Sequence, residues 1–171
     1  GEGETGPAIL NPDFLKAADN AYLFTMISYG RIHTAMFGWA GQVTDQGKIG
    51  DKEIADVIAF MKSSGNMIRD YIYPGANPGN ANEGSMLFNS NCARCHGDNG
   101  NGLRAPQLNN QEFLNAATNG YILAAISIGR TGTDMPSWGK GNDEYPALNG
   151  KQRQDLTAFI RSWQKVRIKF N

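Results

Sequence analysis

The feature that most restricts this chain is a run of five residues, Cys92-Ala93-Arg94-Cys95-His96, which contains both cysteines and one of the two histidines. The residues before it, from Asn82 to Asn91, place apolar side chains at helical spacing, and Asn82 is able to cap the first turn. If a helix continues through the motif, Cys92 and Cys95 are three residues apart and share one face. Both sulfur atoms can then reach one flat ligand.

This spacing predicts covalent attachment of haem. Thioether bonds from Cys92 and Cys95 would hold the macrocycle edge-on, and His96 would place its imidazole under the iron. A zinc site needs four protein ligands, and His33, the other histidine, is far away in the sequence. A thioredoxin-like pair would follow a strand, whose alternating pattern is absent, and a disulfide would strain a single helical turn. We therefore predict one haem c.

The second half of the chain resembles the class I c-type cytochromes. The matching pieces are Gly84-x-x-Leu87-Phe88, Cys92-x-x-Cys95-His96-Gly97, Gly100-x-Gly102, Pro106 and Met135-Pro136-x-Trp138. The resemblance implies an all-α fold in which the first and last helices of a domain cross. It also implies that the haem is attached outside the cytoplasm, in the periplasm or on the extracytoplasmic face of the membrane.

The resemblance further implies the remaining ligands of the haem. The carbonyl of Pro106 would accept a hydrogen bond from the His96 ring, which fixes the orientation of that ring. Met135 would be the second axial ligand, although a methionine can also fill a gap in a core. Arg130 and Trp138 are candidate partners of a haem propionate, through charge and through the indole N–H, or they simply pack the loop. A His/Met pair raises the reduction potential and closes both axial positions, which argues against peroxidase or oxygen-binding activity.

The chain also repeats itself, without gaps, at an offset of 99 residues. Residues 14–39 and 113–138 are identical at 13 of 26 positions. The identical pairs include Tyr22 and Tyr121, Gly30-Arg31 and Gly129-Arg130, Met36 and Met135, and Trp39 and Trp138. We infer that the chain carries two copies of one domain.

The two copies differ at the haem motif. At the same offset Pro7 aligns with Pro106, so the counterparts of Cys92 to His96 would fall before residue 1. Either the first copy has lost its motif and Met36 only packs, or the chain is a fragment and a Cys-x-x-Cys-His segment lies upstream or on a separate peptide. We favour the second interpretation, because a domain of about 63 residues without its first helix and haem has a small core. Met36 is then a candidate ligand of a second haem. We expect His33 to be a surface or loop histidine, although it offers an alternative ligand.

The expected architecture is all-α, with two tandem cytochrome c-like domains, the first incomplete at its amino terminus. We predict that residues 1–63 form the first domain, residues 64–82 a linker, and residues 83–171 the haem-binding domain. In the second domain, Thr118 and Asn149 should cap helices. The face of Leu87 and Phe88 should meet the face of Phe159 and Ile160. The aromatic run 71–73 is predicted to dock on a domain, and the alternating tail, residues 164–170, reads either as a strand that adds to a partner or as a frayed terminus.

The charge balance excludes a bulk attraction to nucleic acid, because 16 basic and 16 acidic side chains cancel. The cancellation hides a difference between the halves. Residues 1–82 hold 6 basic and 9 acidic side chains, a net of −3, whereas residues 83–171 hold 10 and 7, a net of +3. The basic half carries the haem motif, so it could steer an acidic redox partner at low salt.

The resulting hypothesis is an extracytoplasmic electron carrier, not itself an enzyme, that works with redox protein partners as a subunit of a larger complex. The alternative is a haem enzyme of the peroxidase kind, or the cytochrome subunit of a dehydrogenase. The longest apolar stretches, such as residues 21–27, are far shorter than the roughly 18 residues of a membrane span, so we expect no transmembrane segment in this chain. The acidic start of the chain lacks a signal peptide, which is expected of a cytoplasmic protein or of a processed form.

Overall fold

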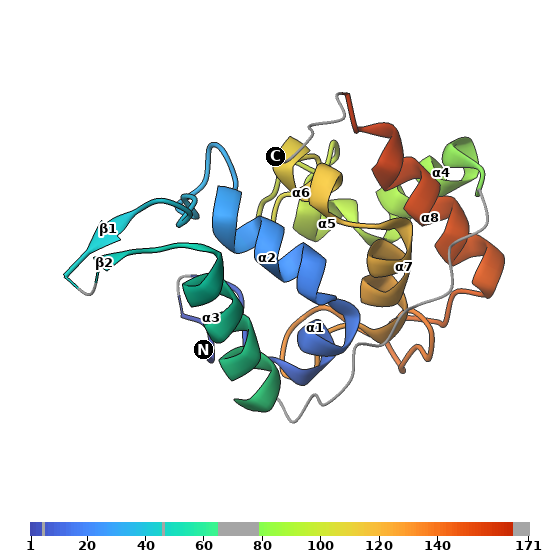
Figure 1. The fold of residues 1–171 in the computed structure, drawn as a ribbon. Helices are drawn as coiled ribbons and strands as arrows, with labels where there is room; N and C mark the ends of the chain where they lie inside the picture. The colour runs from blue at the N-terminus through green and yellow to red at the C-terminus, as the bar shows by residue number, and fades with distance from the viewer. Residues whose placement is uncertain (5, 46, 65–78, 166–171) are drawn as a thin grey trace.

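The computed structural model describes residues 1–4, 6–45, 47–64 and 79–165. These residues form a mostly helical molecule, in which the strands make a short antiparallel hairpin (Figure 1). The elements are, in chain order, α1 (Pro12–Ala17), α2 (Asn20–Tyr29), β1 (Val43–Thr44), β2 (Gly47–Lys48), α3 (Asp51–Ser64), α4 (Ala81–Asn91), α5 (Ala93–His96), α6 (Gln111–Ala116), α7 (Asn119–Ile128) and α8 (Gly150–Ser162). The predicted all-α class is confirmed.

Three helices of the first copy recur in the second copy at the offset of the sequence repeat. Helices α1 and α6 cover equivalent residues, as do α2 and α7, and α3 and α8 begin at equivalent residues. Their caps correspond as well. The side chains of Asn11 and Asn110 accept backbone N–H groups of α1 and α6, and those of Asp19 and Thr118 do the same for α2 and α7. The predicted cap at Thr118 is confirmed, and the repeated sequence produces repeated local structure.

In the second copy α4 crosses α8, and residues of this crossing belong to the main core. Gly84 allows the close approach, because a Cβ atom at this position would lie 2.0 Å from the backbone oxygen of Asp155. Phe88 is fully buried, and its ring centroid lies 5.5 Å from that of Phe159. The predicted contact between the two helical faces is therefore confirmed.

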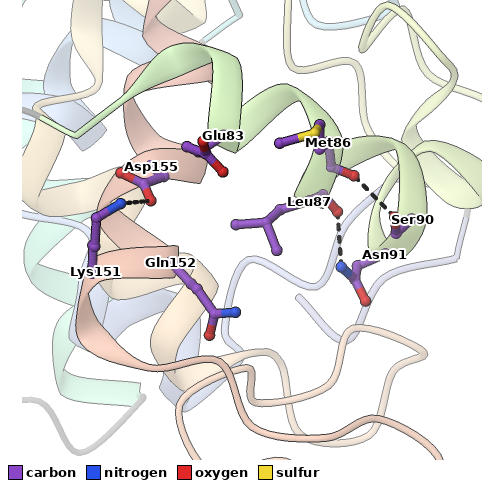
Figure 2. A pocket seen from close by; sticks show the side chains of 8 residues that line it. All are labelled: Glu83, Met86, Leu87, Ser90, Asn91, Lys151, Gln152 and Asp155. Carbon is purple, nitrogen blue, oxygen red and sulfur yellow. Dashed lines mark hydrogen bonds and ion pairs between the residues drawn. The ribbon is translucent and has the colours of Figure 1, made fainter.

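The start of α4 differs from the prediction. Its cap is Asn80, not Asn82, so the helix begins inside the predicted linker. The reason is Asp155 of α8, which accepts the backbone N–H of Asn80 at 2.8 Å and an ammonium proton of Lys151 at 2.7 Å. Burial raises the pKa of Asp155, but these two interactions outweigh it and hold that pKa below its usual value. Figure 2 shows the residues of α4 and α8 that line a pocket between the two helices, with the ion pair of Lys151 and Asp155 at one end. At the start of α8, Asn149 forms the predicted cap as part of a capping box with Gln152.

The two copies pack against each other through equivalent surfaces. The rings of Tyr22 and Tyr121 stack with centroids 4.2 Å apart and an interplanar angle of 21°. Phe14 and Phe113 lie edge-on to the tyrosine of their own copy, at 6.5 Å and 6.2 Å. Helix α1 contacts α7, and α2 contacts α6. Burial, with a smaller effect of Tyr121, raises the pKa of Tyr22 well above its usual value. The buried side chains of both copies form one continuous core.

Helix α3 is covered less completely than its counterpart α8. Val57 and Phe60 on α3 are 48% and 64% exposed. The equivalent residues on α8 are Leu156, which is fully buried, and Phe159, which packs on Phe88 of α4. The side of α8 that α4 covers thus corresponds to an exposed apolar side of α3.

Two sequence predictions fall outside the described residues: the docking of the aromatic run 71–73, and, for most of the tail, the choice between a strand and a frayed terminus. In the part of the chain that the structure describes, no helix has the length and apolar character needed to cross a membrane.

Candidate haem site

The motif cysteines lie where α4 gives way to α5. The backbone N–H groups of Cys95 and His96 both donate to the carbonyl of Cys92, at 3.1 Å and 3.0 Å, so the motif forms one tight turn. Both thiols are free and half-buried. Burial, with a smaller effect of Cys95, raises the pKa of Cys92 to about 12. A neutral thiol is a poor nucleophile and a poor metal ligand, so this environment disfavours a redox dithiol.

His96 is oriented by the loop that follows it. Its Nδ1 lies 2.8 Å from the carbonyl oxygen of Pro106. Because a carbonyl can only accept, Nδ1 carries the proton and Nε2 keeps its lone pair. Burial lowers the pKa of His96, and the bond to Pro106 offsets this only in part. The ring is therefore neutral near pH 7 and presents one nitrogen that can bind a metal.

The loop between His96 and Pro106 returns to the motif by backbone hydrogen bonds. The N–H of Gly102 donates to the carbonyl of His96 at 2.7 Å, and that of Ala105 to the carbonyl of Cys95 at 3.1 Å. Arg104 adds a contact from its guanidinium to Cys95 Sγ at 3.4 Å. These bonds fix the position of Pro106 relative to the imidazole.

Met135 lies on a closed loop after α7. The N–H of Arg130 donates to the carbonyl of Met135 at 3.0 Å, and the hydroxyl of Thr133 accepts the N–H of Met135 at 3.2 Å. Gly129 has a φ of +73°, and a Cβ atom there would lie 2.5 Å from the backbone of Pro136. Met135 is half-buried and packs against the core.

The two candidate propionate partners sit differently. Trp138 is 3% exposed, and its ring lies edge-on to Tyr145 with centroids 5.5 Å apart. Arg130 is half-buried and donates to the carbonyl of Gly129 at 2.8 Å. The packing of Trp138 favours its structural role in the loop, whereas Arg130 keeps further N–H groups that are able to meet an anion.

The first copy keeps the geometry of this loop. The N–H of Arg31 donates to the carbonyl of Met36 at 2.7 Å, as in the equivalent pair of the second copy. Met36 and Trp39 are 39% and 40% exposed, more than their counterparts. His33 is exposed in the same loop, as expected, and its φ of +63° matches that of Gly132, its counterpart.

Three residues that hold the Met135 loop are missed by reasoning from the sequence. Asn11 and Asp13 hydrogen-bond to the backbone of Thr131, and Phe14 lies under the guanidinium of Arg130. All three belong to the first copy. The repeat contained a signal, because Asn11 and Phe14 recur at the equivalent positions of the second copy.

The donor set fits a haem c better than a bare metal ion. Two thiols within one turn can add to two vinyl groups, and an imidazole follows directly in the sequence. Among the described residues, no group of three or more His, Cys, Asp or Glu side chains is placed to hold a metal ion.

Comparison with known proteins gives the class of the chain. Residues 79–160 match the family model described as cytochrome c oxidase, cbb3-type, subunit III. The chain is 29% identical over 167 residues to the cbb3-type cytochrome c oxidase subunit FixP of Azorhizobium caulinodans. This alignment covers 95% of this chain and 53% of that protein. It is 27% identical over 172 residues to the cbb3-type cytochrome c oxidase subunit CcoP of Rhodobacter capsulatus, and this alignment covers 94% of this chain and 54% of that protein. The chain thus spans about half the length of these relatives.

A solved structure shares the fold. It is the reducing HAO-like protein complex of Kuenenia stuttgartiensis, with a TM-score of 0.53 and 18% identity, over 86% of this chain and 73% of that chain. The motif and these matches support a c-type cytochrome, for which haem c is the implied cofactor. More particularly, it is similar to the cytochrome subunits of cbb3-type oxidases.

Proposed function

We propose that this c-type cytochrome is an electron carrier in which Cys92 and Cys95 attach one haem c and His96 and Met135 bind its iron. The observation that carries the proposal is the hydrogen bond between His96 Nδ1 and the Pro106 carbonyl at 2.8 Å. It selects the tautomer that leaves Nε2 free for iron and strengthens the imidazole as a donor. When bound, the haem supplies a one-electron iron couple, whose potential a Met/His ligand pair raises.

The remaining site residues set the surroundings of the haem. Met135 presents its thioether from a loop that closes on itself, so the backbone at this position is held before any ligand binds. Arg130 would meet a propionate, and Trp138 would pack the loop and offer its indole N–H. If His96 and Met135 both bound the iron, no position would remain for peroxide or oxygen, which favours a carrier over the peroxidase-like alternative.

The proposal includes two tandem domains, residues 1–63 and 83–171, with residues 64–82 as linker. The equivalence of α1, α2 and α3 with α6, α7 and α8 supports this division. The exposed side chains of Val57 and Phe60 support the fragment interpretation, because their counterparts on α8 lie under α4. A helix with a Cys-x-x-Cys-His motif, upstream or on a separate peptide, would cover them and bring a second haem to Met36.

We also propose that the protein acts at the periplasmic or extracytoplasmic side of the membrane, as a subunit of a larger redox complex. Two relatives named as subunits of cbb3-type oxidases support a complex, and the haem motif supports the compartment. The net charge of +3 on residues 83–171 supports an acidic partner surface.

The test is the absorption spectrum and potential of the haem-loaded Met135→Ala variant, with Met86→Ala as control. Met86 is 60% exposed on α4 and should be replaceable without effect. Met135→Ala should lose the low-spin His/Met spectrum, bind carbon monoxide when reduced, and have a lower potential. A Met135→Ala protein with the wild-type spectrum and potential would refute the axial assignment.

The haem-to-protein ratio, measured together with the intact mass, tests the arrangement of the two copies. One haem per chain, retained after extraction with acidified solvent, is expected for this sequence. Two haems in the protein isolated from its source would support the second site at Met36, whereas one would support a first copy that has lost its haem.

A further inference from the structure

The loop that carries Met135 is held by residues of the other copy. Thr131 lies four residues before Met135. Its backbone N–H donates to Asp13 Oδ2 at 2.7 Å, and its carbonyl accepts a hydrogen bond from Asn11 Nδ2 at 2.9 Å. Both backbone groups of Thr131 are therefore satisfied by side chains more than 115 residues earlier in the chain.

A third contact fixes the neighbouring residue. The guanidinium carbon of Arg130 lies 5.6 Å from the centroid of the Phe14 ring, a cation–π geometry. Asn11, Asp13 and Phe14 sit at the start of α1, where Asn11 Oδ1 also caps the helix by accepting the N–H groups of the other two residues. We call these three side chains the α1 clamp.

The position of the clamped residues is transmitted to Met135 by short hydrogen bonds. Arg130 donates its N–H to the Met135 carbonyl at 3.0 Å and accepts the N–H of Thr133 at 3.1 Å. A shift of residues 130 and 131 away from α1 must therefore move the backbone of Met135 or break these bonds.

We propose that the α1 clamp is a positioning device for the axial ligand, through which the first copy keeps Met135 on the haem iron of the second. The inference rests on the proposed role of Met135. It goes further, because it makes the ligation of one haem depend on three named side chains of the other copy. None of the three is proposed as a ligand of the haem; they act through the loop.

The repeat supplies a matched contact on the other side of the molecule. Asn110 Nδ2 donates to the carbonyl of Ile32 at 3.2 Å, and the Arg31 guanidinium lies 5.3 Å from the centroid of the Phe113 ring. Asn110 also caps its own helix, α6, through Oδ1. Replacing Asn110 thus perturbs an equivalent interface contact without touching the Met135 loop.

The experiment measures the rate at which cyanide binds to the ferric, haem-loaded protein, since cyanide must wait for Met135 to leave the iron. The variants are Asn11→Asp, Asp13→Ala and the two combined, with Asn110→Asp as control. A carboxylate at position 11 keeps the capping oxygen and removes the N–H donor, so α1 is retained while the clamp is weakened. Because the loss of one hydrogen bond changes an equilibrium constant by about fivefold, the limiting rate should rise about fivefold in each single variant and more in the double variant.

Asn110→Asp should bind cyanide at the wild-type rate. The potential and the intensity of the methionine-to-iron charge-transfer band should fall in the clamp variants and stay unchanged in this control. Wild-type cyanide rates in the double variant would overturn the proposal. So would equal acceleration by Asn110→Asp, because the effect would then be a general loosening of the interface.

Failure of the proposed function would look different. If Met135 is not a ligand, the wild-type protein itself lacks the charge-transfer band and binds cyanide without a limiting rate. Should Asn11→Asp prevent folding, as judged by circular dichroism, Asp13→Ala carries the same test, because it leaves the Asn11 cap in place.

Discussion

Substitution of Gly84 by alanine should separate the two helices that build the haem half of the molecule. A Cβ atom at this position would lie 2.0 Å from the carbonyl oxygen and 2.5 Å from the carbonyl carbon of Asp155, and 2.8 Å from Phe159 Cβ. Two of these neighbours are backbone atoms of α8, which cannot rotate away. Since real Cβ contacts are essentially never shorter than 3.0 Å, the helices must move apart by at least about 1 Å.

The magnitude follows from two opposing effects. Overpacking a well-formed core costs about 1 to 3 kcal/mol, and a clash between two backbones belongs at the upper end of this range. Alanine is favoured over glycine inside a helix by about 1 kcal/mol. The net loss in the free energy of unfolding is therefore about 2 kcal/mol. With a urea dependence of about 2 kcal/mol per molar, the unfolding midpoint should fall by about 1 M.

The assay is urea unfolding of the haem-loaded protein, followed by far-ultraviolet circular dichroism. Gly150→Ala is the matched control, because this glycine is exposed at the first position of α8 and no atom lies within 4 Å of the added carbon. It should be as stable as the wild type or slightly more stable. If Gly84→Ala is also as stable as the wild type, the reasoning about the α4–α8 crossing is wrong.

Further predictions concern buried charge and the uncovered helix. Lys62 is 8% exposed, and its ammonium group donates to the carbonyls of Leu15 and Ala18. Lys62→Met should therefore lower the free energy of unfolding, measured in urea, by about 2 to 4 kcal/mol. A loss no larger than that of Lys52→Met, at an exposed lysine, would contradict this. The pKa of Asp155 is lower in the folded protein than its usual value, so its stabilisation is complete above about pH 4 and is lost as the pH falls through the folded value. Asp155→Asn should accordingly flatten the acid limb of a plot of unfolding midpoint against pH, and an unchanged limb would exclude this carboxylate as its source. Leu156→Ala should lower the free energy of unfolding by about 2 to 5 kcal/mol, whereas Val57→Ala, at the equivalent position of α3, should lower it by less than about 1 kcal/mol. Equal losses would show that α3 is covered to the same extent as α8.

The sequence predicts best where a local rule determines the structure. The caps at Thr118 and Asn149 follow from side chains that accept the N–H group three residues ahead. The motif turn follows from the spacing of Cys92 and Cys95. The cap of α4 was misjudged because two asparagines, Asn80 and Asn82, stand near its start, and a distant carboxylate decides between them.

The contacts between the copies could not be predicted in the same way. The repeat shows that Tyr22 and Tyr121 are equivalent, but equivalence within each copy does not say which faces meet. Their stacking depends on tertiary packing across 99 residues of sequence. Lys62 is a similar case, because nothing around it in the sequence distinguishes this buried lysine from a solvated one. Only the fold brings the backbone carbonyls of Leu15 and Ala18, near the end of α1, within hydrogen-bond distance of its ammonium group.

The contacts between the copies also change how the first copy should be interpreted. Its intact loop, with Arg31 and Met36, is interpreted from the sequence as a candidate site for a second haem. In the structure Arg31 lies over Phe113 and donates to the carbonyl of Gln107 at 2.5 Å, both in the second copy. Packing between the copies alone is thus a sufficient reason to keep this loop, with or without a haem. The exposed Phe60 on α3 has no such explanation, since its counterpart Phe159 lies against α4. The case for a second haem-bearing helix therefore depends on the uncovered side of α3 rather than on the presence of Met36.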